Sequence, residues 1–214
     1  FMTDFKPLKV LGQGTFGCVF ATEKTIVESL DGKFAVKRIP LERRNTNNEK
    51  VLEEVKALYR FNHPGIVRFY DAWKEDPPRG WQRYADSILL QAIYSNEHFD
   101  YRDDSSFLYI QMELCQSTLA DWLSANHIRD QSRMIHWFKQ IVSAVAYIHE
   151  KGKMHRDLKP SNILFLNEDH VKICDLGIVS DRMITNDDGG QEVSKERTTE
   201  QGTKMYMAPE QGLG

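Results

Sequence analysis

The chain has 214 residues, of which 41% are hydrophobic and 28% charged, and its formal net charge is -3. This length allows one large domain or two small ones, and the slightly acidic balance argues against non-specific nucleic-acid binding through a basic surface. No apolar run approaches the ~20 residues that span a bilayer, and the first residues lack the basic and apolar regions of a signal peptide.

The first 40 residues are predicted to form strands joined by turns. The apolar runs are 8–11, 17–22 and 33–39, and Asp31-Gly32 between the last two is a strong hairpin signal. A helix is expected over 48–61, because its apolar residues fall on one face; His63-Pro64-Gly65 ends it.

Two further strands are expected at 66–73 and 107–113. Residues 74–106 between them are polar, and we interpret them as a surface insertion, at least partly mobile, with 88–93 as a candidate strand.

Two helices are then predicted at 117–125 and 132–150, the second ending near Gly152. The longer helix carries an apolar stripe at helical spacing: Ile135, Phe138, Ile141, Val142, Val145 and Ile148. Residues 181–200 are polar and contain glycines, which is typical of a flexible loop, and no internal repeat is evident.

Three cysteines, Cys18, Cys115 and Cys174, are odd in number and far apart. This pattern fits neither a disulfide framework nor a zinc site, and it favours a reducing compartment. The simplest interpretation is three buried thiols.

Residues 12–19 read Gly-Gln-Gly-Thr-Phe-Gly-Cys-Val, which is typical of a glycine-rich phosphate loop. Glycines let the backbone approach phosphate oxygens and let amide groups point at them. A plain strand–turn–strand explains the same residues about equally well. The segment lies between two predicted strands rather than before a helix, which disfavours a Rossmann site.

Lys37 ends the apolar run Ala35-Val36 on the next predicted strand. A lysine in this place is usually a surface charge. Here it lies 20 residues after Gly17, and Glu54 follows 17 residues later on the predicted helix. A lysine that binds the α- and β-phosphates needs a carboxylate to fix its head; Glu54 can supply it, and the adjacent Glu53 is the alternative.

Residues 154–162 read Met-His-Arg-Asp-Leu-Lys-Pro-Ser-Asn, and an Asp-Leu-Gly triplet begins 13 residues later at Asp175. Phosphoryl transfer requires positioned oxygens, magnesium and neutralised charge. Asp157 suits accepting or orienting a hydroxyl proton, and Lys159 suits the transferring phosphoryl group. Asn162 and Asp175 offer the oxygen ligands that magnesium prefers. Separate explanations for each of these residues would have to coincide, so we interpret them as one phosphoryl-transfer centre.

These motifs, in this order and with Ala208-Pro209-Glu210 after them, resemble a eukaryotic protein kinase. The resemblance implies an α+β, two-lobed fold. Residues 1–114 would be a complete small lobe, an antiparallel sheet plus one helix with the insertion at about 74–106. Residues 115–214 would be the first part of a mainly helical large lobe, truncated because its C-terminal helices are absent. Lys159 with Pro160 behind it resembles the serine/threonine class.

The same resemblance implies binding of ATP and Mg²⁺. Met112 would be the gatekeeper, the backbone of Glu113 to Cys115 the adenine-binding hinge, and Glu54 is preferred because it lies nine residues before His63. Lys37 and Glu54 would act with Asp157 and Lys159 in catalysis, and Asn162 and Asp175 would hold the metal. The implied nucleotide-binding set is Leu11, Gly12, Gly14, Gly17, Val19, Ala35, Lys37, Met112, Glu113, Cys115 and Leu164.

Two regulatory expectations also rest on the resemblance. A phosphate on Thr198, with Thr199 as the second choice, would pair with Arg156 and order the 181–200 loop. Cys18 would lie on the phosphate loop, Cys115 on the hinge and Cys174 beside Asp175, so oxidants should weaken nucleotide binding, mainly through a more exposed Cys18.

A closer resemblance is to the PERK-type kinases of the alpha subunit of translation initiation factor two, carried by residues 54–58, 63–68, 77–81 and 109–115. It implies a serine of that subunit as the substrate, in a stress response (the unfolded protein response) that lowers translation. It also implies a homodimer through the small lobe and no direct contact of this segment with nucleic acid or membrane. The location would be the cytoplasmic face of an endoplasmic-reticulum membrane protein whose span lies outside this chain.

The competing interpretation is a pseudokinase or a regulatory fragment without catalysis. The absent C-terminal helices favour it, whereas intact Lys37, Asp157, Asn162 and Asp175 oppose it.

Overall fold

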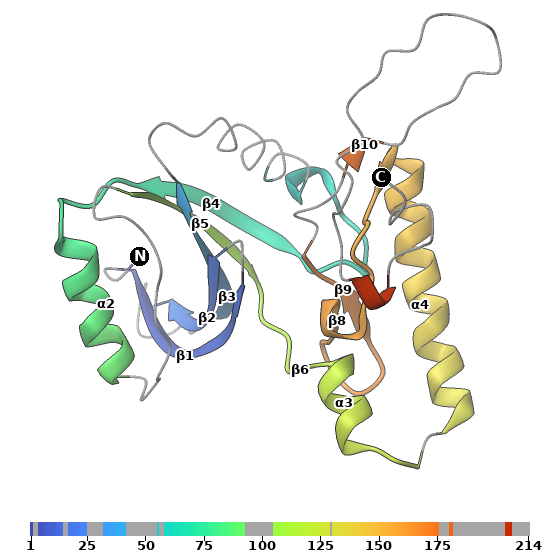
Figure 1. The fold of residues 1–214 in the computed structure, drawn as a ribbon. Helices are drawn as coiled ribbons and strands as arrows, with labels where there is room; N and C mark the ends of the chain where they lie inside the picture. The colour runs from blue at the N-terminus through green and yellow to red at the C-terminus, as the bar shows by residue number, and fades with distance from the viewer. Residues whose placement is uncertain are drawn as a thin grey trace, which may run out of the picture. The chain divides into compact units, whose positions relative to one another are not determined.

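A computed structural model of the chain describes residues 1, 4–14, 17–24, 32–41, 55, 58–92, 105–128, 130–175, 180–181 and 204–206. The chain divides into two compact units (Figure 1). The first unit comprises Phe1–Arg60 and Arg68–Cys115, and the second comprises Phe61–Val67 and Gln116–Gly214.

The first unit is built on a five-stranded antiparallel sheet with the strand order β1-β2-β3-β5-β4. The strands are β1 (Phe5–Gly14), β2 (Gly17–Lys24), β3 (Gly32–Leu41), β4 (Phe69–Glu75) and β5 (Ser106–Glu113). The predicted antiparallel sheet is therefore confirmed, although Ile66 lies outside β4 and makes an isolated bridge to Ile173.

Both faces of this sheet are apolar, because side chains alternate along each strand. One face carries a core of Phe5, Phe20, Val36, Phe107 and Tyr109 with neighbours. The other face carries Ile39, Leu41, Leu108 and Ile110, against which Val55 and Leu58 pack. Of the helix expected over 48–61, the described residues 55 and 58–60 are helical.

The insertion contains a helix, α2 (Trp81–Ala92), so the candidate strand at 88–93 is wrong. A short apolar run does not distinguish a strand from a helix, and helical spacing here brings Gln82, Ala85, Asp86 and Leu89 to one buried face. Leu89 joins the core that contains Phe20. Figure 1 shows α2 beside the sheet of the first unit, so this part of the insertion is a surface helix that packs one face on the core.

The second unit contains α3 (Leu119–Ala125) and α4 (Gln131–Glu150). Thr118 and Asp121 form a capping box at the start of α3, and the Asp130 carboxylate accepts hydrogen bonds from two amides at the start of α4. Gly152, in the left-handed region at φ 71°, follows the end of α4 as predicted.

Short strands and turns complete the second unit. β6 (Ser117–Thr118), β8 (Ile163–Phe165) and β9 (Val171–Ile173) form one sheet, and β7 (Lys153–Met154) pairs with β10 (Ser180–Asp181). Two 3-10 turns are η1 (Pro160–Asn162) and η3 (Lys204–Tyr206).

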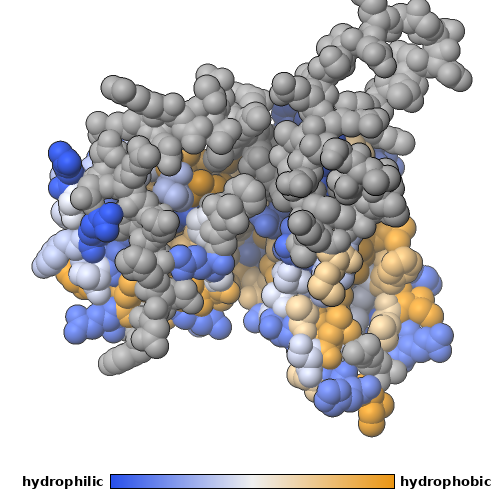
Figure 2. All heavy atoms as spheres, in the orientation of Figure 1, coloured by the Kyte–Doolittle hydropathy of each residue, from blue (hydrophilic) through white to orange (hydrophobic). Residues whose placement is uncertain are grey.

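The apolar stripe predicted on α4 coincides only partly with the face of the helix that is buried. Trp137, Ala144 and Ile148 are buried, whereas Phe138 is 64% exposed and Ile135 and Val142 are also exposed. Figure 2 shows hydrophobic side chains on the visible surface of this unit. The helix has two apolar faces, and periodicity alone does not say which of them is buried. Within the described part of the chain, no helix is long and apolar enough to cross a membrane.

The segment 61–67 belongs to the second unit although the chain on both sides of it belongs to the first. The Ile173 amide donates to the Gly65 carbonyl at 2.8 Å, and the Val67 amide donates to the Ile173 carbonyl at 3.0 Å. The Asn62 amide donates to the Tyr147 hydroxyl at 3.1 Å. These bonds fix the segment against α4 and β9.

Candidate active site

The glycine-rich segment closes the hairpin between β1 and β2, where Gly14 lies opposite Gly17. Gly17 has φ +121°, and a Cβ on it would lie 2.0 Å from the Arg38 carbonyl oxygen. A side chain is thus excluded at Gly17 by both backbone conformation and space. A Cβ at Gly12 would meet nothing within 4 Å.

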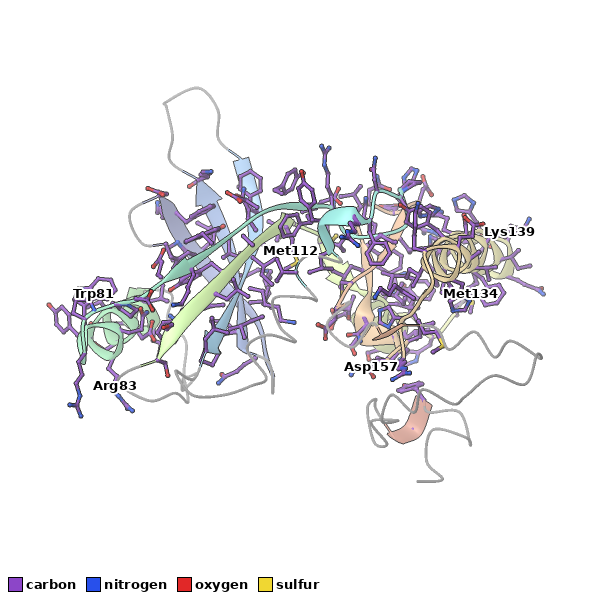
Figure 3. All side chains as sticks on the ribbon, turned by 90° about the horizontal axis from the view of Figure 1, so that it is seen from above. Trp81, Arg83, Met112, Met134, Lys139 and Asp157 are labelled. Carbon is purple, nitrogen blue, oxygen red and sulfur yellow. The ribbon has the colours of Figure 1, made fainter. Side chains whose placement is uncertain are left out.

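Four of the predicted nucleotide-contacting residues lie on one face of the sheet: Val19, Ala35, Lys37 and Met112. Val19 pairs with Lys37, and Ala35 pairs with Met112, which is labelled in Figure 3. Their chain neighbours point into the core on the opposite face. Lys37 is half-buried; Glu54, its expected partner, lies outside the described residues, so their ion pair stays a prediction.

Cys18 is 4% exposed and lies in the core on the opposite face of the sheet from Val19. The expectation that Cys18 is the more exposed thiol of a nucleotide site is therefore wrong, because strand alternation turns it away from that face. Cys115 and Cys174 are half-buried.

The predicted hinge is anchored at its two ends. The Glu113 amide donates to the Arg68 carbonyl at 2.9 Å, and the Glu113 carboxylate accepts from the Arg68 amide at 3.2 Å. At the other end, the Gln116 amide donates to the Phe165 carbonyl at 2.8 Å. Leu164, expected beside the adenine, lies on β8 and is half-buried.

In the second unit, Asp157 (labelled in Figure 3) contacts two other predicted site residues. The Asn162 amide nitrogen donates to the Asp157 carbonyl at 2.8 Å and to its carboxylate at 3.0 Å. The Lys159 ammonium lies 2.8 Å from the same carboxylate. Asp157 is 6% exposed, and a buried carboxylate needs such partners because burial without them is costly. The structure thus brings together three of the predicted site residues.

His155 is hydrogen-bonded to the backbone of this cluster. Its Nδ1 accepts a hydrogen bond from the Asp157 amide at 3.3 Å, so we assign the proton to Nε2, which donates to the Cys174 carbonyl at 2.9 Å. Burial lowers the pKa of His155, which favours this neutral form. The imidazole therefore ties the Asp157 loop to the residue before Asp175, a connection between segments that the motif spacing does not reveal.

Two non-glycine residues at this site, Arg156 and Asp175, have positive φ angles of 63° and 57°. Non-glycine residues rarely adopt this region, and such strain concentrates at functional sites because the surrounding structure must hold it. The Cys174 amide, which donates to the Asn162 carbonyl at 2.9 Å, helps to hold Asp175 next to η1.

The residues present fit a magnesium ion by the chemistry of their donors. The amide nitrogen of Asn162 is turned toward Asp157, which turns its oxygen away from that carboxylate. An amide oxygen and the Asp175 carboxylate are hard ligands suited to Mg²⁺, which keeps several waters and binds phosphate oxygens. No group of three or more His, Cys, Asp or Glu residues in the described ranges is arranged to hold a metal by itself.

Several predicted residues lie outside the described part of the chain. They are Glu54, Thr198, Thr199 and Glu210, together with most of the 181–200 loop. Pairing of Arg156 with a phosphorylated threonine therefore stays a prediction.

A comparison with protein families matches the description "Protein kinase domain" to residues 5–211. The chain is 36% identical over 219 residues to an interferon-induced, double-stranded RNA-activated protein kinase of Mus musculus, covering 99% of this chain and 36% of that protein. It is 35% identical over 232 residues to the eIF-2-alpha kinase GCN2 of Arabidopsis thaliana, covering 98% of this chain and 18% of that protein.

Identity is lower, 24% over 412 residues, to the eukaryotic translation initiation factor 2-alpha kinase 3 of Bos taurus, a PERK-type kinase; the match covers 99% of this chain and 36% of that protein. The likeness thus reaches several kinases of this group and does not single out the PERK type. The chain spans little more than a third of the length of these relatives at most.

Proposed function

The chain belongs to the protein kinase domain family, and we propose that it carries the catalytic machinery of a serine/threonine kinase acting on the alpha subunit of translation initiation factor two. The observation that carries the catalytic part is the contact of the buried Asp157 carboxylate with the Asn162 amide and the half-buried Lys159 ammonium. The substrate part rests on the similarity to two kinases that are named for the alpha subunit of this factor.

Asp157 accepts the proton of the attacking hydroxyl or orients that hydroxyl, because its carboxylate is held by Asn162 and lies 2.8 Å from the Lys159 ammonium. The Lys159 ammonium neutralises charge on the transferring phosphoryl group. Lys159 and Pro160 also support a serine or threonine as the acceptor, by resemblance.

Asn162 and Asp175 would hold magnesium, which supplies charge neutralisation to the phosphates when bound. In the first unit, Lys37 would bind the phosphates of ATP and Glu54 would fix its head. Gly12, Gly14 and Gly17 would present backbone amides to phosphate oxygens. Homodimer formation and an endoplasmic-reticulum location stay predictions of the resemblance.

The test is phosphate transfer from labelled ATP with magnesium to the purified alpha subunit. We expect label on a serine of the subunit, and we expect Asp157→Asn to lower the rate by about 10²–10⁴-fold, the usual contribution of a catalytic base. ATP binding should persist in that variant. A subunit whose acceptor serine is replaced by alanine is the substrate control.

Magnesium-dependent ATP binding without transfer to any protein would contradict the proposal and favour the pseudokinase. Equal transfer by the Asp157→Asn variant would instead show that Asp157 is not the base.

A further inference from the structure

The inner face of α2 forms a buried ion pair with the sheet of the first unit. The guanidinium of Arg38 on β3 donates two hydrogen bonds to the Asp86 carboxylate, at 2.6 and 3.0 Å. Gln82, one turn earlier on α2, donates to the same carboxylate at 3.0 Å. The side chains of Arg38 and Asp86 are 3% and 6% exposed. The pair is therefore bidentate, buried and supported by a third group.

Aromatic rings hold the guanidinium in place. Its central carbon lies 5.3 Å from the ring centres of both Phe20 and Phe107. A buried charge whose partner is lost is strongly unfavourable, so Arg38 keeps this position as long as α2 is docked. Asp86 thus fixes the side chain of a residue in the middle of β3.

The backbone of Arg38 lies at the glycine-rich hairpin. Its carbonyl oxygen occupies the space where a Gly17 side chain would be, and Arg38 pairs with Cys18 across the two strands. Lys37 precedes Arg38 and points to the other face of β3. One residue therefore contacts α2 through its side chain and borders Gly17 and Lys37 through its backbone.

We propose that Arg38 and Asp86 are positioning residues for nucleotide binding, through which the docked helix α2 fixes the relative placement of Gly17 and Lys37. This inference rests on the proposed function, because it concerns the ATP site. The competing role is a purely structural one, in which the ion pair attaches α2 to the sheet and has no effect on the affinity of the nucleotide site. Trp81 and Arg83 project from the outer side of α2 and are not members of this ion pair (Figure 3).

The test compares affinity for MgATP, measured by calorimetry, with the melting temperature of the same proteins. Asp86→Asn keeps the side-chain size but removes the charge and one acceptor. We expect its dissociation constant for MgATP to rise roughly tenfold or more, because small misplacements of binding groups have effects of this size. In the transfer assay, the KM for ATP should rise while kcat is largely retained. Arg38→Lys, which keeps the charge and loses the bidentate geometry, should show a smaller rise.

Two variants serve as matched controls. Asp76→Asn removes the same charge from an exposed ion pair with Lys74 in the same insertion, where Asp76 is 53% exposed. Leu41→Ala lowers stability by removing a buried contact at the far end of β3. We expect both to bind MgATP as the unaltered chain does.

A lower melting temperature with unchanged MgATP affinity in Asp86→Asn would overturn the inference and leave only the structural role. An equal loss of affinity in Leu41→Ala at equal loss of stability would also overturn it. If the unaltered chain bound no MgATP, the proposed function would fail together with the inference.

Discussion

The substitution Gly17→Ala tests whether the glycine-rich hairpin depends on the close approach of β3. An alanine at φ +121° adopts a backbone region that costs about 1–3 kcal/mol for a residue with a side chain. The reduced freedom of the unfolded chain offsets about 0.4–1 kcal/mol of this. The added Cβ also lies 2.0 Å from the Arg38 carbonyl, so β2 and β3 must separate and weaken hydrogen bonds worth about 1 kcal/mol each.

Together these effects predict a loss of about 2–4 kcal/mol in the free energy of unfolding. For a chain of this size the melting temperature should fall by roughly 5–15 °C. The matched control is Gly12→Ala, because its Cβ meets nothing within 4 Å and Gly12 has no positive φ. Differential scanning fluorimetry of both variants without nucleotide measures the difference. If Gly17→Ala melted at the same temperature as Gly12→Ala, the close approach of the Arg38 carbonyl would not restrict the residue at position 17.

Two further predictions concern the second unit. Asn162→Ala should lower the free energy of unfolding by about 2–4 kcal/mol, because its hydrogen bonds to the carbonyl and to the buried carboxylate of Asp157 are both lost. Denaturant unfolding measures this change, and a loss below about 1 kcal/mol would contradict the prediction. The lowered pKa of His155 means that the unfolded chain binds more protons than the folded one below its unfolded pKa of about 6.5. Stability should therefore fall as the pH drops from about 7 to 5, and His155→Gln should flatten this dependence, whereas an unchanged pH profile in that variant would show that another group is responsible. The pKa of His63 is also lowered, mainly by burial. His63 is present in both the unaltered chain and His155→Gln, so the difference between their pH profiles of stability isolates the contribution of His155.

The sheet of the first unit was predictable because its strands alternate apolar residues and are separated by clear turn signals. Helix α2 was not, because Gln82 and Asp86 on its buried face are polar. Their burial makes sense only with Arg38 beside them, and Arg38 is 48 residues away in the chain. A sequence contains no local signal for such a partner.

The centre of the site was predictable because Asp157, Lys159 and Asn162 lie within six residues of one another and their motif is specific. The bridge from His155 to the Cys174 carbonyl was not, because it joins segments 19 residues apart. The burial of Cys18 was predictable, because side chains alternate along a strand and Val19 faces the nucleotide side. The prediction of an exposed Cys18 was wrong because it treated a residue of the phosphate loop as necessarily exposed.

The attachment of residues 61–67 to the second unit limits how this chain can be dissected. The polypeptide passes from one unit to the other at 60/61, at 67/68 and again at 115/116. A fragment ending at Cys115 would carry Ile66, which is 3% exposed, without β9, to which Ile66 is bridged at Ile173. The complementary fragment would leave the amide and carbonyl of Ile173 without Gly65 and Val67. Cutting at the hinge therefore yields two incomplete pieces, and a functional split protein needs residues 61–67 transferred to the second piece.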